Sequence, residues 1–226
     1  MNRRFEKFRR PLFLRLLAAG MALGLLSACT GGQSVQERNA KAVESNREAE
    51  AFFLQWRFAL QENRWNEVVE GLSHATRNWL SDMVRASRMD RRQELMDRTF
   101  EELVLILTLR VDRRLDPAMD DRLPALMGKF LGESSPIRRS FLKAELGEYQ
   151  NYGDRVVLGL REAPQVPVFH FKRENGVWHL DMRQTMPLLM RGAESLSRPH
   201  GRDKLEQTVW LLKNWAGREV LPEDIQ

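Results

Sequence analysis

Residues 166–183, VPVFHFKRENGVWHLDMR, decide the fold. Two runs rich in β-branched and aromatic residues flank Asn175-Gly176. This dipeptide favours a two-residue type I′ turn because both of its positions accept a positive φ. The stretch therefore predicts a β-hairpin between strands at 166–173 and 177–183.

The register of this hairpin predicts one apolar and one polar face. Side chains alternate between the faces of a strand, so Phe171 should face Leu180 and Phe169 should face Met182. Trp178 should lie on the same apolar side. The opposite face should carry the polar residues of the hairpin, which are His170, Lys172, His179, Asp181 and Arg183.

Outward from the hairpin, the sequence period separates strands from helices. Two further segments of strand length, 141–149 and 155–161, come before the hairpin, and Asn151-Tyr152-Gly153-Asp154 is a turn signal between them. Apolar residues three and four apart predict helices on both sides of the strands, at 43–60, 65–87, 91–109 and 123–131 before them and at 188–197 and 205–216 after them. We therefore expect an α+β fold: N-terminal helices packed in a curved antiparallel sheet of about four strands, followed by C-terminal helices.

Two parts of this arrangement resemble a known family. Phe58-Ala59-Leu60, followed by residues 63–69, NRWNEVV, resembles the first helix, tight turn and second helix of nuclear transport factor 2-like domains. Residues 174–181, ENGVWHLD, are similar to their late hairpin, in which a turn Gly precedes a core Trp. The resemblance covers residues 43–185 and implies a cone-shaped α+β domain. The stretch at 85–136 is longer and more helical than the family pattern.

The resemblance also bears on chemistry. Family members that are enzymes place an Asp or a Tyr-Asp pair inside the cone, and the nearest candidates here are Tyr149, Tyr152 and Asp181. We expect Asp181 on the outward face, so no catalytic pair is predicted. Periplasmic phospholipid-shuttling proteins, whose helices and sheet enclose acyl chains, are an alternative resemblance.

The N-terminal residues have the pattern of an export signal. Basic residues fill the first ten positions, and an apolar stretch runs from Leu12 to Leu26. Its uninterrupted part is too short for a membrane span of about 20 apolar residues. Leu26-Ser27-Ala28-Cys29 then resembles the lipobox of bacterial lipoproteins at all four positions. This resemblance implies cleavage before Cys29 and fatty acids, such as palmitate, on its sulfur and amine.

These signals define the expected domains and location. We expect a signal peptide at 1–28, a lipidated tether at 29–42 and a single α+β domain at 43–217, followed by a tail at 218–226. Within that domain, 43–185 is the core of the family resemblance and 186–217 holds the C-terminal helices. Thr30, where an inner-membrane retention signal usually has Asp, predicts anchoring at the periplasmic face of the outer membrane.

The charge balance argues against a nucleic-acid partner. Of 36 Lys and Arg and 31 Asp and Glu, the signal peptide holds six and one, which leaves 30 of each in the mature chain. The basic excess therefore belongs to the export signal, and no global electrostatic attraction to nucleic acid remains. Cys29 is the single cysteine, so no disulfide is expected.

No catalytic, cofactor or metal motif emerges from the sequence. The histidines are not spaced as zinc ligands, and His170 facing Asp181 is typical of a solvated cross-strand pair. We expect a non-enzymatic, membrane-anchored module that binds or assembles envelope proteins; the alternative is a carrier of lipid or another apolar ligand between sheet and helices. Residues that could line such a pocket are Trp56, Trp65, Trp79, Phe169, Phe171 and Trp178.

Overall fold

The computed structural model describes residues 35–133 and 135–226, so the signal peptide and Cys29 lie outside the described residues. The chain divides into two units, residues 1–43 and 44–226, and the second holds the sheet. Helix α2 spans Val35–Gln61. Helix α2 thus begins inside the segment expected to be a tether, because Gln, Glu, Arg, Lys and Ala at 35–42 favour helix without an apolar period.

The fold is α+β, as predicted, with helices on both sides of the sheet in the sequence. The helices that precede the sheet are α2, α3 (Trp65–Glu70), α4 (His74–Met89), α5 (Arg92–Asp97), α6 (Phe100–Leu115), α7 (Leu123–Phe130) and α8 (Pro136–Lys143). The strands are β1 (Leu146–Asn151), β2 (Arg155–Leu160), β3 (Ala163–Glu174) and β4 (Val177–Leu180). The α-helices that follow are α9 (Met182–Ser197) and α10 (Lys204–Ala216).

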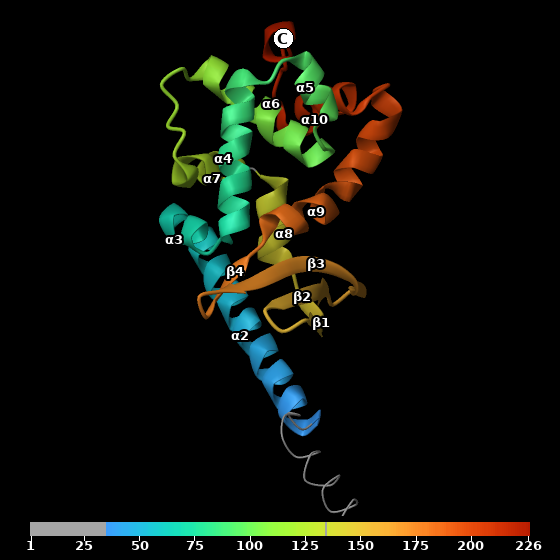
Figure 1. Cartoon of the computed structure of the whole chain (residues 1–226). Coiled ribbons are helices and arrows are strands. Elements are labelled where there is room, and N and C mark those ends of the chain that lie inside the picture. The colour runs from blue at the N-terminus through green and yellow to red at the C-terminus, as the bar shows by residue number, and fades with distance from the viewer. Residues whose placement is uncertain (1–34, 134) are drawn as a thin grey trace, which may run out of the picture. The chain divides into compact units, whose positions relative to one another are not determined.

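The sheet is antiparallel, with its four strands in sequence order. Figure 1 shows α8 and α9 beside the sheet, and α4, α5, α6 and α10 gathered beyond them. The edge at β4 is covered, because Leu180 exchanges backbone hydrogen bonds with Gly71 and Ser73 at 2.9 Å each. This pairing removes one exposed sheet edge and ties the sheet to the start of α4.

The predicted hairpin is confirmed, apart from its end. Asn175 and Gly176 have φ angles of 51° and 83°, and Phe171 pairs with Leu180 as expected. The prediction that Phe169 faces Met182 is wrong, because α9 begins at Met182. Asp181 turns the chain out of the sheet by accepting a hydrogen bond from the backbone N–H of Gln184, which is the behaviour of an N-cap.

The segment predicted as the first strand is partly helical. Helix α8 occupies 136–143, and β1 begins only at Leu146. Ser135 caps α8 by accepting from the N–H of Arg138, and a proline stands at the first helical position. Ile137 and Phe141, four residues apart, are both buried on one face of this helix. Local capping and helical spacing therefore decide the conformation of residues 136–143.

Two predicted helices are each divided by a cap. Ser73 accepts from the N–H of Thr76 and separates α3 from α4. A capping box of Thr99 and Glu102 starts α6 after α5 has ended at Asp97. Helix α6 is buried nearly all round, as its apolar residues predicted.

The C-terminal stretch is also part of the fold. The sequence assigned 218–226 to a tail, but the Arg114 side chain donates to both carboxylate oxygens of Asp224 at 3.3 and 3.2 Å. Arg110, also on α6, donates to the backbone oxygen of Asp224 at 2.8 Å. Two arginines of α6 therefore hold this stretch against the helices. The stretch has no apolar periodicity, so its sequence pattern does not predict this packing.

Candidate functional site

Five of the six aromatic residues proposed as pocket lining are packed in the core. Trp56, Trp79, Phe169, Phe171 and Trp178 are each less than 8% exposed. Their indole N–H groups are satisfied inside the fold; that of Trp56, for example, donates to the Val68 carbonyl at 2.9 Å. These aromatic residues therefore stabilise the domain, and little of their surface is open to a ligand.

Aromatic rings pack closely between β3 and helices α2 and α8. Phe53 of α2 and Phe169 of β3 have ring centroids 4.9 Å apart, and Phe141 of α8 lies 5.6 Å from Phe169. Trp56 meets Phe141 edge-on at 5.1 Å. Such spacing is that of a close-packed aromatic core. An apolar pocket between α4, α6 and α7 has a volume of about 20 Å³, enough for one water molecule and far too small for an acyl chain.

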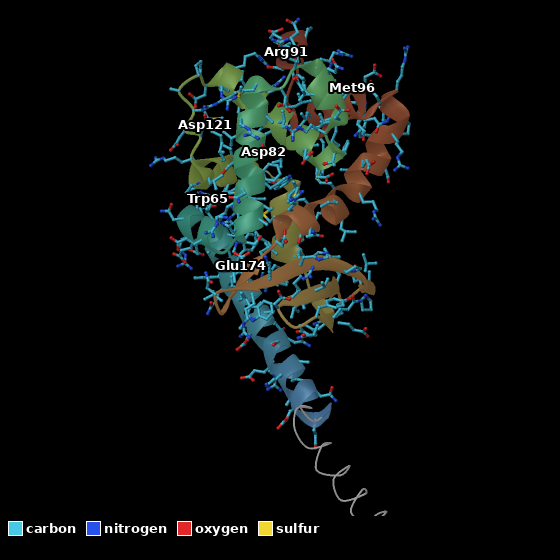
Figure 2. The ribbon with its side chains drawn as sticks, in the orientation of Figure 1. Trp65, Asp82, Arg91, Met96, Asp121 and Glu174 are labelled. Carbon is cyan, nitrogen blue, oxygen red and sulfur yellow. The ribbon has the colours of Figure 1, made fainter. Side chains whose placement is uncertain are left out.

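Trp65 is the exception, because it is only half-buried and lines an open hollow. Figure 2 shows it at the start of α3, and the hollow of about 600 Å³ extends from there to the start of α7. The indole is wedged, however: a Cβ added to Gly128 of α7 would lie 3.2 Å from its nitrogen, and the Arg138 guanidinium lies 5.9 Å from its ring centroid. Trp65 therefore joins α3 to α7 and exposes only part of its ring.

A second hollow, of about 740 Å³, lies on the sheet face that carries His170 and Lys172, and Phe171, which is 1% exposed, is among its lining residues. Along β3, His170 and Lys172 alternate with Phe169 and Phe171 and so point to the other face. We call this second hollow the sheet-face hollow. Residues from β1, β2, β3, their turns and the start of α9 line it, and they include Gln150, Tyr152, Asp154, Arg155, Val157, Pro167, His170, Lys172, Asp181 and Gln184.

Two cross-strand rows build the sheet-face hollow. In the first row, Gln150 pairs with Val157, which pairs with His170. In the second row, the Tyr152 N–H donates to the Arg155 carbonyl at 2.8 Å, and Arg155 pairs with Lys172. Val157 is 8% exposed and forms an apolar floor, whereas Tyr152 is 63% exposed at the rim. Most of the other lining residues are polar or charged, so the hollow is suited to a ligand with polar groups.

His170 and Asp181 are both at the sheet-face hollow, but they are tied to the backbone. The His170 carbonyl accepts from the Asp181 N–H at 2.8 Å, and the His170 N–H donates to the Thr185 hydroxyl at 3.1 Å. The Asp181 carboxylate caps α9 and accepts from the Thr76 hydroxyl at 3.3 Å. Asp181 thus has a structural task at the junction of sheet and helix.

Burial governs the protonation of His170. Desolvation lowers the pKa of its imidazole below the usual 6.5, against the opposing influence of the Asp181 charge and a backbone hydrogen bond at Pro167. The imidazole is therefore neutral at pH 7 and offers one donor and one acceptor.

Tyr149, the other tyrosine considered from the sequence, lies on the helix-facing side. Its hydroxyl donates to Glu50 of α2 at 2.5 Å. Desolvation, together with the hydrogen bond and charge of Glu50, raises the pKa of Tyr149 to about 12. Tyr149 and Asp181 are therefore on different faces of the sheet and do not form a pair.

Sequence reasoning missed most of the sheet-face hollow. Tyr152, His170, Lys172 and Asp181 were singled out, but Gln150, Arg155 and Val157 were not. Their signal was the alternation within 155–161, which places Val157 and Arg155 on one face. This signal could not be read without the strand pairing that brings the two rows together.

The remaining sequence predictions concern ions and membranes. Arginines near α4, α5 and α6 pair with interleaved acidic residues; Arg98, for example, pairs with Asp90 at 2.8 Å. Across 35–133 and 135–226, no three His, Cys, Asp or Glu side chains cluster as metal ligands would. In the same residues, no helix is both long and apolar enough to cross a bilayer. Comparison of the chain with protein-family models, characterised proteins and solved structures gave no match.

Proposed function

We propose that this protein is a lipoprotein, anchored through Cys29 at the periplasmic face of the outer membrane, that works as a non-enzymatic binding or assembly module. The basic first ten residues, the short apolar stretch and the sequence Leu26-Ser27-Ala28-Cys29 support the export and lipidation steps. Several acyl chains, at about 0.8 kcal/mol per buried CH₂, make such anchoring effectively permanent.

The sheet-face hollow is the observation that carries the binding role. Its volume of about 740 Å³ lies within the range of roughly 300–1,000 Å³ that is typical of ligand sites. Tyr152 is 63% exposed at its rim, and exposed tyrosines are enriched where proteins bind one another. A short segment of an envelope protein fits this combination of apolar floor and polar rim.

The resemblance to nuclear transport factor 2-like domains belongs to the same proposal. An antiparallel meander with a late Asn-Gly hairpin and a preceding helix packed on its apolar face supports it. In this chain aromatic rings fill the helix-facing side, where the family's cone would be hollow. Binding is therefore assigned to the opposite face of the sheet.

The non-enzymatic part of the proposal rests on how the titratable groups are used. Asp181 caps a helix, and Tyr149 is locked to Glu50 on the other face. The apolar pocket among α4, α6 and α7 holds about 20 Å³, too small for an acyl chain. A hollow of about 360 Å³ between α8, α9 and the sheet is partly lined by charged residues such as Lys143 and Arg161, so the carrier function remains the alternative.

Two experiments test the proposal. Replacing Cys29 with Ser in the full chain should leave unlipidated precursor that keeps its signal peptide; normal processing would contradict the anchor. A photo-crosslinking residue at Tyr152 should join the protein to a discrete envelope partner. The same residue at Leu196, which is 70% exposed on α9, should not, and equal capture from both positions would contradict the binding role.

A further inference from the structure

The rim of the sheet-face hollow sets two cations directly opposite each other. Arg155 on β2 and Lys172 on β3 are cross-strand partners, and their side chains are 71% and 41% exposed. Like charges in this position destabilise a sheet. The arrangement is therefore unfavourable unless an anion lies between or beside the two groups.

The carboxylates of the chain only partly meet this need. Asp154 lies 3.9 Å from Arg155, and Glu174 lies 3.5 Å from Lys172, both longer than a normal hydrogen bond of up to about 3.2 Å. The Glu174 oxygen Oε1 faces Lys172, and its other oxygen, Oε2, accepts from the backbone N–H of His74 at 3.0 Å. Arg155 and Lys172 thus keep hydrogen-bonding capacity for an additional acceptor.

The other polar groups of the sheet-face hollow add donors near the same end. The Tyr152 hydroxyl donates to the Gln150 side-chain oxygen at 3.0 Å, which leaves the amide nitrogen of Gln150 as a further donor. The second carboxylate of the hollow, Asp181, is engaged by Thr76 and Gln184. Arg155, Lys172 and the Gln150 amide therefore supply donors in the hollow, beside the carboxylates of Asp154 and Asp181.

We propose that the sheet-face hollow binds an extended protein segment that carries an acidic side chain, whose carboxylate lies between Arg155 and Lys172. The inference rests on the proposed binding function and names its ligand class. An Arg guanidinium binds a carboxylate through two parallel hydrogen bonds, and Lys172 supplies a second positive charge from the neighbouring strand. The rest of the segment lies over Val157, and the exposed Tyr152 ring packs against it.

A peptide pair tests the ligand class directly. The full-length, lipidated protein in detergent is titrated with a blocked pentapeptide of alternating Val and Glu, and with a matched peptide in which Gln replaces Glu. NMR shifts of the isotope-labelled protein report binding. We expect the acidic peptide to shift signals of Tyr152, Arg155 and Lys172, and to bind at least about tenfold more tightly than its Gln counterpart. Equal affinity of the two peptides would overturn the proposal.

Matched variants locate the site. The double variant Arg155→Gln with Lys172→Gln should weaken the acidic peptide at least about tenfold. The control removes the same charge near the other end of β2, by Arg161→Gln with Lys143→Gln, and should change affinity less than about twofold. Arg161 is 72% exposed and already paired with Glu145 at 2.8 Å. An equal loss in both double variants would show a general charge effect and overturn the assignment.

Further outcomes separate the ligand class from the binding function. If inorganic phosphate shifts the same signals and the acidic peptide does not, the ligand is a simple anion and the inference is overturned. If Tyr152 crosslinks to a partner but neither peptide binds, the ligand class is wrong and the binding function stands. If crosslinking from Tyr152 also fails, both the ligand class and the binding function are wrong.

Discussion

Replacing Arg138 with Met should unfold the domain at a measurably lower temperature. Arg138 is 6% exposed, and its guanidinium donates to the Gln61 carbonyl at 2.9 Å and to the Leu131 carbonyl at 3.2 Å. It also donates to the Asn63 side chain at 2.6 Å. These acceptors lie at the ends of α2 and α7, where a cation is favoured by the helix dipoles.

The magnitude follows from the fate of each acceptor. A buried acceptor left without its partner costs about 1 to 3 kcal/mol, which gives roughly 3 to 9 kcal/mol for three. Gln61 and Asn63 are exposed residues and can accept from water, whereas Leu131 is fully buried. Met also avoids the desolvation of a buried charge, which offsets part of the loss. We therefore expect a net loss of about 3 kcal/mol in the free energy of unfolding.

Thermal and urea unfolding, followed by circular dichroism of the protein in detergent, measure this loss. For a domain of this size, about 3 kcal/mol corresponds to roughly 6 to 12 °C in Tm. The control is Arg139→Met on the exposed side of α8, which should change stability by less than about 0.5 kcal/mol. The stability loss in Arg138→Lys should lie between those of Arg138→Met and Arg139→Met, because an ammonium group cannot reach all three acceptors as the planar guanidinium does. A loss below about 1 kcal/mol in Arg138→Met would refute the reasoning.

Three further predictions concern ionisation and a close backbone approach. In a Tyr152→Phe variant, Tyr149 is the remaining tyrosine, and its absorbance titration should have a midpoint near 12 that falls when Glu50 is replaced by Gln; a midpoint near 10 would contradict this. Because the unfolded phenol ionises near 10, the stability that Tyr149 contributes should be complete below pH about 10 and disappear between about 10 and 12. The lowered pKa of His170 predicts an NMR titration midpoint below 6.5 and a free energy of unfolding that decreases as the pH falls through that midpoint. The variant His170→Gln should lack this part of the acid dependence of stability. An unchanged pH profile in the variant would argue against burial of His170 as the cause. Gly159→Ala should lower the free energy of unfolding by roughly 1 to 3 kcal/mol, because the added Cβ would overlap a backbone oxygen of β3. The control Gly192→Ala, on α9 with open space around it, should be neutral or stabilising. Similar effects of both variants on urea unfolding would contradict the close approach at Gly159.

The hairpin and the apolar helices could be predicted because their information is local. Asn175-Gly176 fixes the turn by backbone conformation, and Phe171 then pairs with Leu180 by counting residues. Residues 103–109 of α6, LVLILTL, are almost entirely apolar, and the fold buries all of them. Each of these features depends on neighbours within a few positions in the sequence.

The errors occurred where capping decided between two conformations. Phe141 was assigned to a strand because it begins a segment of strand length with an alternating pattern, but Ser135 and the proline after it start a helix that extends to Lys143. Asp181 was placed on a strand face, yet its carboxylate starts α9. In both cases one side-chain hydrogen bond to a backbone N–H outweighs a weak β preference.

The sheet-face hollow could not be predicted because it is assembled from four segments that pair only in the folded chain. Lys172 was recognised as a polar residue, but its significance comes from Arg155 opposite it, 17 positions earlier in the sequence. The aromatic residues show the opposite error. They were proposed as pocket lining because they stand out in the sequence, but most of them are packed in the core. Aromatic rings at helical spacing supply the apolar area that a core needs, so they indicate stability first. An open face is instead marked by polar residues whose charges remain incompletely paired after folding, and Arg155 and Lys172 are the pair that meets this description.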